Sequence, residues 1–229
     1  HRHLDYYAHF FRSTELNGVF YRTPTPKAVR AWAAQTPDEF VFAWKASKYI
    51  THWKRLKPDT RHSIALMESR LRLLKSKAGP VLFQLPPQFK KDTTRLSSFL
   101  KRLRKKRPYV FEFRHPSWYA ADVLELLRDH QSALCISDHE DAPAPWEITA
   151  PHVYVRGHGP FGNYRGRYAP QTLAAWARRL SRLRDDGHSI YVYFDNDQKS
   201  AAPLDAKRMA RLLGVRPDLP AGLHANRQQ

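Results

Sequence analysis

Seven short runs with β-strand character recur along the chain, and a stretch with helical periodicity follows most of them. Strands that alternate with helices predict parallel strands joined by helical crossovers. Polar or charged residues come at the downstream end of nearly every run, which is where a (β/α) barrel collects its functional groups. The runs cover residues 14–21, 39–47, 80–86, 109–115, 133–138, 152–159 and 189–196. We therefore expect an α/β fold of the TIM (β/α) barrel type.

The spacing of the runs also predicts the domain organisation. No eighth run precedes Leu4, so we expect a barrel that lacks its N-terminal first strand in this chain. A chain of 229 residues is close to the roughly 250 residues of a single such barrel. We expect one barrel domain over residues 1–215 and a loosely held tail over residues 216–229.

Local signals predict where the helices lie. Thr25 followed by Pro26 is typical of a helix start, since threonine caps the first turn and proline suits its first position. A helix marked by Ile64 and Leu71 is expected to end with Gly79 as its C-cap. The prolines within 141–145 predict an irregular connection there. Further helices are expected near residues 93–105, 120–130, 170–184 and 203–213.

An open, doubly wound sheet is the competing architecture. Such folds carry a Gly-x-Gly-x-x-Gly turn after an early strand, and this chain has none. The polar strand ends are also spread through the whole chain, whereas an open sheet gathers them at one switch point. Both observations favour the barrel.

The chain is strongly basic, with 39 Lys and Arg against 21 Asp and Glu and a formal charge of +18. Such a charge attracts polyanions, so nucleic acid is a candidate partner. The excess is scattered over several expected helices, and its densest run, residues 101–107, fits a solvated outer helix face. No apolar run approaches the roughly 20 residues that span a bilayer, so we expect no membrane segment. With Cys135 as its single cysteine, the chain is expected to be cytoplasmic and free of internal disulfides.

Seven motifs follow one another in a characteristic order over residues 4–213. Together they closely resemble the DUF72 (YecE-like) family, which implies a TIM-type barrel and no particular reaction, because that family has no established one. Two departures stand out: family members usually open with a glycine-rich strand that lies before the start of this chain, and Asp195 and Asp205 stand where asparagine is more common. The motifs are Glu15-Leu16-Asn17 with Phe20-Tyr21-Arg22, Phe40-Val41-Phe42-Ala43-Trp44-Lys45, Thr51-His52, Gln84-Leu85-Pro86-Pro87, Glu112-Phe113-Arg114-His115, Tyr154-Val155-Arg156-Gly157-His158-Gly159 and Tyr193-Phe194-Asp195-Asn196-Asp197.

The strand ends supply a candidate catalytic cluster. Period-two alternation places Glu112 and Arg114 on one face, which points into the barrel if the neighbouring phenylalanines pack on the helices. Arg156 and His158 share a face in the same way. Our hypothesis makes Glu112 a general base, Arg114 and Arg156 the groups that stabilise charge, and His158 a residue that transfers a proton or orients the ligand. Further side chains expected to position a ligand are Asn17, Lys45, His52, Gln84, Asp138 and Asn196.

A different interpretation of this cluster is purely structural. Buried charges must be paired, so Glu112 could simply neutralise Arg114 and Arg156 inside the barrel. The sequence leaves both interpretations open.

Residues 157–166 hold four of the nine glycines and follow the sixth run. Barrels often bind phosphate after their last strands, and glycine lets backbone amides approach an anion closely. We therefore expect Gly157, Gly159 and Arg165 to contact a phosphate group together with Arg156 and His158. The alternative is a mobile loop that uses glycine only for its turns.

The functional hypothesis is that the barrel mouth binds an anionic, phosphate-containing small molecule or nucleotide, with hydrolase-like acid/base chemistry. The alternative is a non-catalytic nucleic-acid-binding protein that uses its basic surface. No cofactor is called for, but a divalent metal ion stays open, although no spacing is diagnostic. The side chains that could ligate it are His52, His115, Asp138, His139, Glu140, Asp141 and His158.

Overall fold

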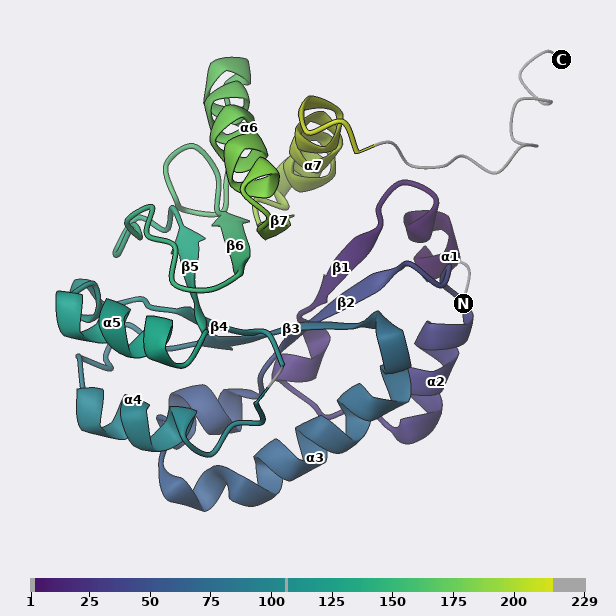
Figure 1. Ribbon diagram of the computed structural model, residues 1–229. Coiled ribbons are helices and arrows are strands. Elements are labelled where there is room, and N and C mark those ends of the chain that lie inside the picture. Colours follow the sequence, from purple (N-terminus) through teal and green to yellow (C-terminus); the bar gives the residue numbers. More distant parts are fainter. Residues whose placement is uncertain (1–2, 106, 216–229) are drawn as a thin grey trace, which may run out of the picture.

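The computed structural model describes residues 3–105 and 107–215, and it contains one seven-stranded sheet. All six neighbouring strand pairs are parallel, and the strands follow one another around the sheet in chain order (Figure 1). The sheet curls into a nearly closed barrel, which confirms the predicted fold class. The strands are β1 Ser13–Leu16, β2 Val41–Lys45, β3 Ala78–Gln84, β4 Tyr109–Glu112, β5 Ala133–Ser137, β6 His152–Gly157 and β7 Ser189–Phe194.

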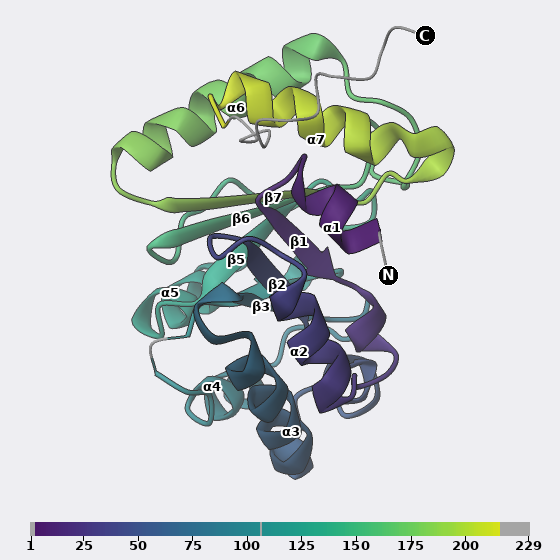
Figure 2. The same ribbon diagram turned by 90° about the vertical axis from the view of Figure 1, so that its right-hand side faces the viewer.

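Helices cover the outside of the sheet. Figure 2 shows α6 and α7 lying side by side against the last strands, with α2 and α3 on the far side of the barrel. As predicted, the Thr25 hydroxyl caps α2 by accepting a hydrogen bond from the Ala28 amide at 3.2 Å. The helices are α1 His3–Ala8, α2 Pro26–Ala34, α3 Arg61–Leu71, α4 Thr93–Leu100, α5 Ala121–Asp129, α6 Pro170–Asp185 and α7 Ala201–Leu212.

Short helical turns fill several of the connections. The most consequential are η1 Gly18–Phe20 and η2 Tyr49–Trp53, because they follow β1 and β2 at the carboxyl ends of those strands. The others are η3 Pro58–Thr60, η4 Arg72–Lys77, η5 Pro116–Trp118 and η6 Gln198–Ser200. The connection from β5 to β6 has no regular element, as the prolines within residues 141–145 predicted.

Side-chain alternation separates the interior of the barrel from the layer beneath the helices. Phe111 and Phe113 of the fourth run pack into the cluster under the helices, whereas Val110 belongs to the interior cluster. Glu112 shares the parity of Val110 and is fully buried. The interior cluster also contains Ala43, Leu82, Ala133, Cys135 and Tyr154, from β2, β3, β5 and β6. The alternation therefore turns Glu112 inward, as expected.

The barrel stays open between its first and last strands. In the described residues no backbone ladder joins β1 to β7, and a cavity of about 710 Å³ lies between them, bounded also by α1 and α7. Its lining includes Glu15 and Asn17 on one side and Tyr191, Tyr193 and Asp195 on the other. Of the described helices, none is both long and apolar enough to cross a membrane.

Two expectations about local structure were wrong. The first predicted run, residues 14–21, is a strand only to Leu16, after which η1 begins at Gly18. Gly79 does not cap a helix but lies inside β3, where a Cβ atom would come within 2.4 Å of Val41 Cγ1. It is required because β2 and β3 approach each other closely there. The predicted tail over residues 216–229 lies outside the described residues.

Candidate functional site

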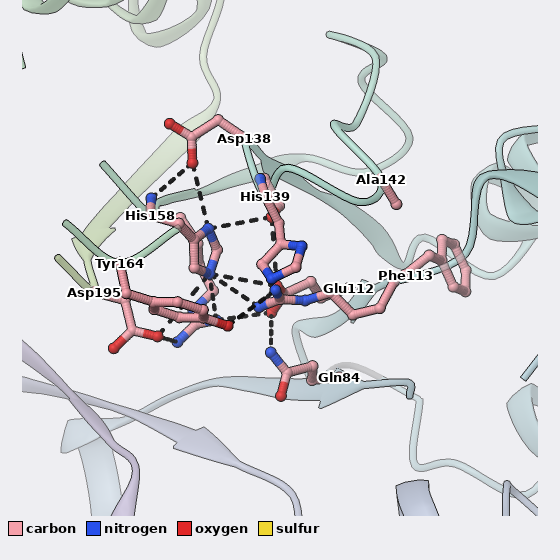
Figure 3. Close-up of polar contacts among 12 residues, drawn as sticks. Gln84, Glu112, Phe113, Asp138, His139, Ala142, His158, Tyr164 and Asp195 are labelled. Atoms are coloured by element: carbon pink, nitrogen blue, oxygen red, sulfur yellow. Dashed lines mark hydrogen bonds and ion pairs between the residues drawn. The ribbon is translucent and has the colours of Figure 1, made fainter. Parts of the chain in front are cut away.

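Glu112 lies at the centre of a buried network at the carboxyl end of β4 (Figure 3). Its carboxylate is 2.5 Å from Arg114 Nη2 and 2.9 Å from Arg156 Nη1, and it accepts a hydrogen bond from Gln84 Nε2 at 3.2 Å. Burial alone would raise the pKa of Glu112, but the two guanidinium groups outweigh it and hold that pKa well below its usual range. The predicted role as a general base is therefore not supported, because so weak a base takes up a proton poorly near neutral pH.

Arg156, on β6, joins three carboxylates. Its Nε and Nη2 atoms bond Glu15 of β1 at 3.1 and 2.8 Å, and Nη2 also reaches Asp195, just after β7, at 2.9 Å. With the Glu112 contact, its donors are largely occupied within the protein. Arg156 thus ties β1, β4 and the end of β7 together across the barrel, which corresponds to the structural interpretation of this residue.

Arg114 has fewer acidic contacts. Its Nη1 donates to the Tyr164 hydroxyl at 3.0 Å, and its Nε is buried without an acceptor in the described residues. Tyr164 has a backbone φ of 68°, in the left-handed region, where a non-glycine residue is held at a cost of about 1–3 kcal/mol. This strained backbone places the Tyr164 ring over the Arg114 guanidinium, whose central carbon lies 5.9 Å from the ring centroid.

His158 and Asp138 form a second pair at the same end of the barrel. Asp138 accepts a hydrogen bond from the His158 amide at 2.6 Å and lies 3.3 Å from His158 Nδ1. On the other side of the ring, Nε2 lies 2.9 Å from Arg114 Nη2 and 3.2 Å from Arg156 Nη1. Guanidinium groups only donate, so Nε2 must offer a lone pair and the ring proton belongs on Nδ1, facing Asp138. Asp138 also accepts from the Tyr168 hydroxyl, which fixes its orientation.

Lys45 is a cation without an acidic partner. It lies at the end of β2, and among the described residues its ammonium group makes no ion pair; Nζ sits 4.8 Å from the centroid of the Phe20 ring. Burial lowers the pKa of Lys45, and the Arg156 guanidinium lowers it further. His52 packs against the same Phe20 ring, with 5.1 Å between the ring centroids. Burial and the positive charges of Lys45 and Lys48 lower the pKa of His52 to about 4, so it is neutral at pH 7.

Other predicted ligand-binding residues serve the structure. Asn196 is buried and donates to the Gly166 carbonyl and to Asp205, so it holds the glycine-rich loop against α7 and does not face the mouth. The Gly159 amide donates to the Tyr168 hydroxyl, so it is not free for a phosphate group. Gly157 is part of β6, where a Cβ atom would lie 2.8 Å from that same hydroxyl.

Two more predicted residues lie away from the Glu112 network. Asn17 is exposed and borders the cavity between β1 and β7. Arg165 is exposed on the glycine-rich loop. The structure thus brings together Glu112, Arg114, Arg156, His158, Gln84 and Asp138, with Lys45 and His52 close by.

No group of three or more His, Cys, Asp or Glu side chains within residues 3–105 and 107–215 is arranged to hold a metal ion. The candidate ligands His115 and His139 have other contacts. His115 Nδ1 accepts from the Ser117 amide at 3.2 Å, and His139 Nδ1 accepts from the Asp141 amide at 3.3 Å.

The sequence hypotheses left three members of the network without a committed role. Glu15 and Asp195 complete the contacts of Arg156, and Tyr164 covers Arg114. Glu15 could have been found, since it alternates with Asn17 in the first predicted run and β1 ends at the same barrel mouth. Tyr164 could not, because nothing in a glycine-rich loop indicates which of its side chains turns inward.

Comparisons with known proteins agree with this architecture. Residues 1–228 match the model of the family described as "Protein of unknown function DUF72". The chain is 28% identical over 244 residues to the UPF0759 protein YunF of Bacillus subtilis (strain 168), covering 93% of this chain and 86% of that protein. It is 33% identical over 121 residues to the UPF0759 protein YecE of Escherichia coli (strain K12), covering 51% of this chain and 43% of that protein.

Solved structures with the same fold include a DUF72 family protein from Thermotoga maritima MSB8. It shares 25% identity with a TM-score of 0.81, over 93% of this chain and 89% of that one. A DUF72 family protein from Enterococcus faecalis V583 superimposes with a TM-score of 0.82 at 21% identity, over 93% of this chain and 88% of that one.

Proposed function

Because the chain belongs to the DUF72 family, whose description gives no activity, its function has to be inferred from its own site, and we propose that the barrel mouth binds an anionic, phosphate-containing small molecule. The observation that carries this proposal is the Lys45 ammonium group, a partly buried cation at a strand end with no acidic partner among the described residues. Burying such a charge costs free energy unless an anion pairs with it.

The neighbours of Lys45 favour an external anion. Its nearest described contact is the Phe20 ring, which offers only a weak cation–π attraction. The acids Glu15, Glu112 and Asp195 all act on it, but each is already within 2.9 Å of Arg156. The acidic groups of the mouth are therefore satisfied by Arg156, while Lys45 is left for a ligand.

Arg114 is the second group that we assign to the ligand. Among the described residues, one of its nitrogens pairs with an acid and another donates to the hydroxyl of Tyr164. Tyr164 as a whole residue is 40% exposed. An incoming phosphate oxygen could replace that hydroxyl, since an anion is the stronger acceptor for a guanidinium group. Lys45 would then supply a point charge and Arg114 a directed donor.

We assign acid/base chemistry to His158, with Asp138 as its positioning residue. The Nδ1 proton faces Asp138, so the reactive lone pair is on Nε2, on the side of the guanidinium groups. An anion that draws Arg114 away from Nε2 would remove the shorter of its two guanidinium contacts, leaving Arg156 Nη1 at 3.2 Å, and would make this lone pair more available to accept a proton, for example from a water attacking a phosphate ester. Glu112, with its lowered pKa, stays ionised and holds the two arginines in place.

Lys45→Met tests the proposal. Phosphate binding is measured by isothermal titration calorimetry with inorganic phosphate and with a nucleoside monophosphate. A hydrogen bond to a charged group is worth roughly 1.5–3 kcal/mol, so affinity should fall about 10- to 100-fold. Lys54→Met is the matched control, because Lys54 is paired with Asp59 at 2.5 Å on the surface.

A second measurement makes the result decisive. Loss of a cation that the folded state disfavours should not lower the melting temperature, so Lys45→Met should be at least as stable as the parent. Equal phosphate affinity in Lys45→Met and the parent would refute the proposal. His158→Gln should retain phosphate affinity but lose any phosphomonoester hydrolysis; hydrolysis that persists would remove His158 from the chemistry.

A further inference from the structure

Four large aromatic side chains stand out from the surface on the loops around the barrel mouth. We call Tyr21, Trp53, Phe161 and Tyr164 the aromatic rim; their exposed fractions are 77%, 68%, 77% and 40%. Tyr21 follows β1, Trp53 ends the turn η2 after β2, and the other two follow β6. Because the strands are parallel, these loops all lie at the carboxyl end of the barrel. Of the strongly exposed aromatics in the described chain, only Tyr6, on α1, lies elsewhere.

The two halves of the rim are connected to the mouth through ring contacts. Tyr21 packs edge-on against Phe20 at 4.9 Å between centroids, and Phe20 in turn contacts His52 and Lys45. On the other side, the Tyr164 ring lies 5.1 Å from that of His158. The rim therefore flanks the candidate ligand site on two sides.

Cations are interleaved with these rings. Lys48 Nζ lies 6.0 Å from the centroid of Trp53, and the Arg114 guanidinium lies 5.9 Å from that of Tyr164. Arg22 follows Tyr21 directly, and Arg165 follows Tyr164; both are exposed. The rim is thus an aromatic surface with positive charge beside each of these three rings, and not a plain apolar patch.

The loop that carries Phe161 and Tyr164 is closely held to the protein. Gly162 has a φ of 68°, and a Cβ atom there would come within 2.3 Å of the Asp138 carbonyl oxygen. The Gly162 carbonyl accepts from the Glu140 amide at 3.2 Å, and the Tyr164 amide donates to the His158 carbonyl at 2.6 Å. A backbone fixed so tightly, with the Phe161 ring turned to solvent and the Tyr164 ring partly exposed over Arg114, is suited to presenting those rings to a partner.

We infer that the aromatic rim binds a single-stranded nucleic acid, with bases stacked on its rings and backbone phosphates on its cations. Exposed aromatics interleaved with cations are what sequence-tolerant recognition of single strands uses. The formal charge of +18 favours a polyanion over a neutral or basic partner. Duplex DNA is a poorer match, since its bases are stacked on one another and are not available to the rings.

This inference extends the proposed function, because a nucleotide strand carries both a phosphate for Lys45 and bases for the rim, yet the two can fail separately. Lys45→Met should weaken a strand with a terminal phosphate more than the same strand without that phosphate. Trp53→Ala should weaken both strands equally.

The test is fluorescence anisotropy with labelled 12-nucleotide oligo(dT) and oligo(U), with and without a terminal phosphate, against a duplex of the same length. Stacking of one base on an aromatic ring is lost in Trp53→Ala and in Phe161→Ala, so each should weaken single-strand binding about 5- to 100-fold. Tyr6→Ala is the matched control, because Tyr6 is 67% exposed but lies on α1, off the rim. Comparing the two oligonucleotides decides whether DNA or RNA is preferred.

Three outcomes would overturn the inference. The first is a duplex that binds as tightly as the single strand. The second is a set of rim variants that bind as well as Tyr6→Ala, which would assign any affinity to the basic outer helices. The third is binding to vesicles of anionic phospholipid without binding to either oligonucleotide, which would assign the rim to a lipid surface.

Discussion

Glu15→Gln should destabilise the barrel well beyond what a surface ion pair would. The Glu15 side chain is 4% exposed and accepts from Tyr154 Oη at 2.5 Å and from Arg156 Nε and Nη2 at 3.1 and 2.8 Å. The substitution removes the charge, keeps the size and leaves one acceptor oxygen. Breaking a buried ion pair costs roughly 3–5 kcal/mol. Arg156 retains Glu112 and Asp195, so we expect the lower end, about 3 kcal/mol.

That loss is large enough to measure clearly. For a domain of this size, 1 kcal/mol corresponds to roughly 2–4 °C, so the melting temperature should fall by about 6–12 °C. Urea denaturation gives the free energy of unfolding directly. Glu147→Gln is the control, because its ion pair with Arg128 at 2.8 Å is about half exposed and should be worth less than about 1 kcal/mol.

The location of the effect is a second criterion. Glu15 belongs to β1, which is paired on one side only, so hydrogen exchange of the amides in Ser13–Leu16 should quicken in Glu15→Gln and not in Glu147→Gln. Equal stability of the two variants would refute the reasoning that Arg156 fastens β1 to the rest of the barrel.

Two further changes test local features. The pKa of His52 is about 6.5 in the unfolded chain and about 4 in the fold, so on acidification the unfolded chain takes up this proton first. The free energy of unfolding should therefore fall as pH drops from about 6.5 towards 4. His52→Asn should reduce the difference between the urea midpoints measured at pH 7 and pH 5, and an unchanged difference would contradict this assignment. Gly162→Ala should destabilise the protein more than Gly187→Ala. Both glycines have a positive φ, which costs an alanine about 1–3 kcal/mol, but a Cβ at Gly162 would also meet backbone at 2.3 Å, whereas among the described residues no atom lies within 4 Å of one at Gly187. Similar free energies of unfolding for the two variants would show that the loop moves to make room.

The fold and the inward-facing side chains were largely predictable. Period-two alternation around Phe111 and Glu112 fixes which face is buried under helices, and the parallel order of strands brings their ends to one mouth. The glycine-rich loop was different, because its contacts depend on tertiary structure. No local sequence pattern indicates that the Tyr168 hydroxyl accepts a hydrogen bond from the Gly159 amide, or that Asn196 donates one to the Gly166 carbonyl.

Roles within the network were also beyond the sequence. The sequence predicts that Glu112 lies near Arg114 and Arg156. The pKa of Glu112, however, depends on the distances of 2.5 and 2.9 Å between its carboxylate and those guanidinium groups, which only the fold sets. The same holds for Lys45, which has no acidic partner in the described part of the chain because Arg156 binds Glu15, Glu112 and Asp195. The end of the first predicted run was misjudged because η1 begins at Gly18, where the apolar residues Val19 and Phe20 still suggested a strand.

The opening between β1 and β7 allows the width of the barrel mouth to change. Elsewhere the distance between neighbouring strands is set by backbone hydrogen bonds. Between β1 and β7 it depends on Arg156, which binds Glu15 on β1 and Asp195 just after β7. An anionic ligand that competes with Asp195 or Glu15 for Arg156 would loosen this hold and let the two strands separate. Occupancy of the mouth and the width of the barrel are therefore thermodynamically linked, so anything that wedges the strands apart should alter ligand affinity.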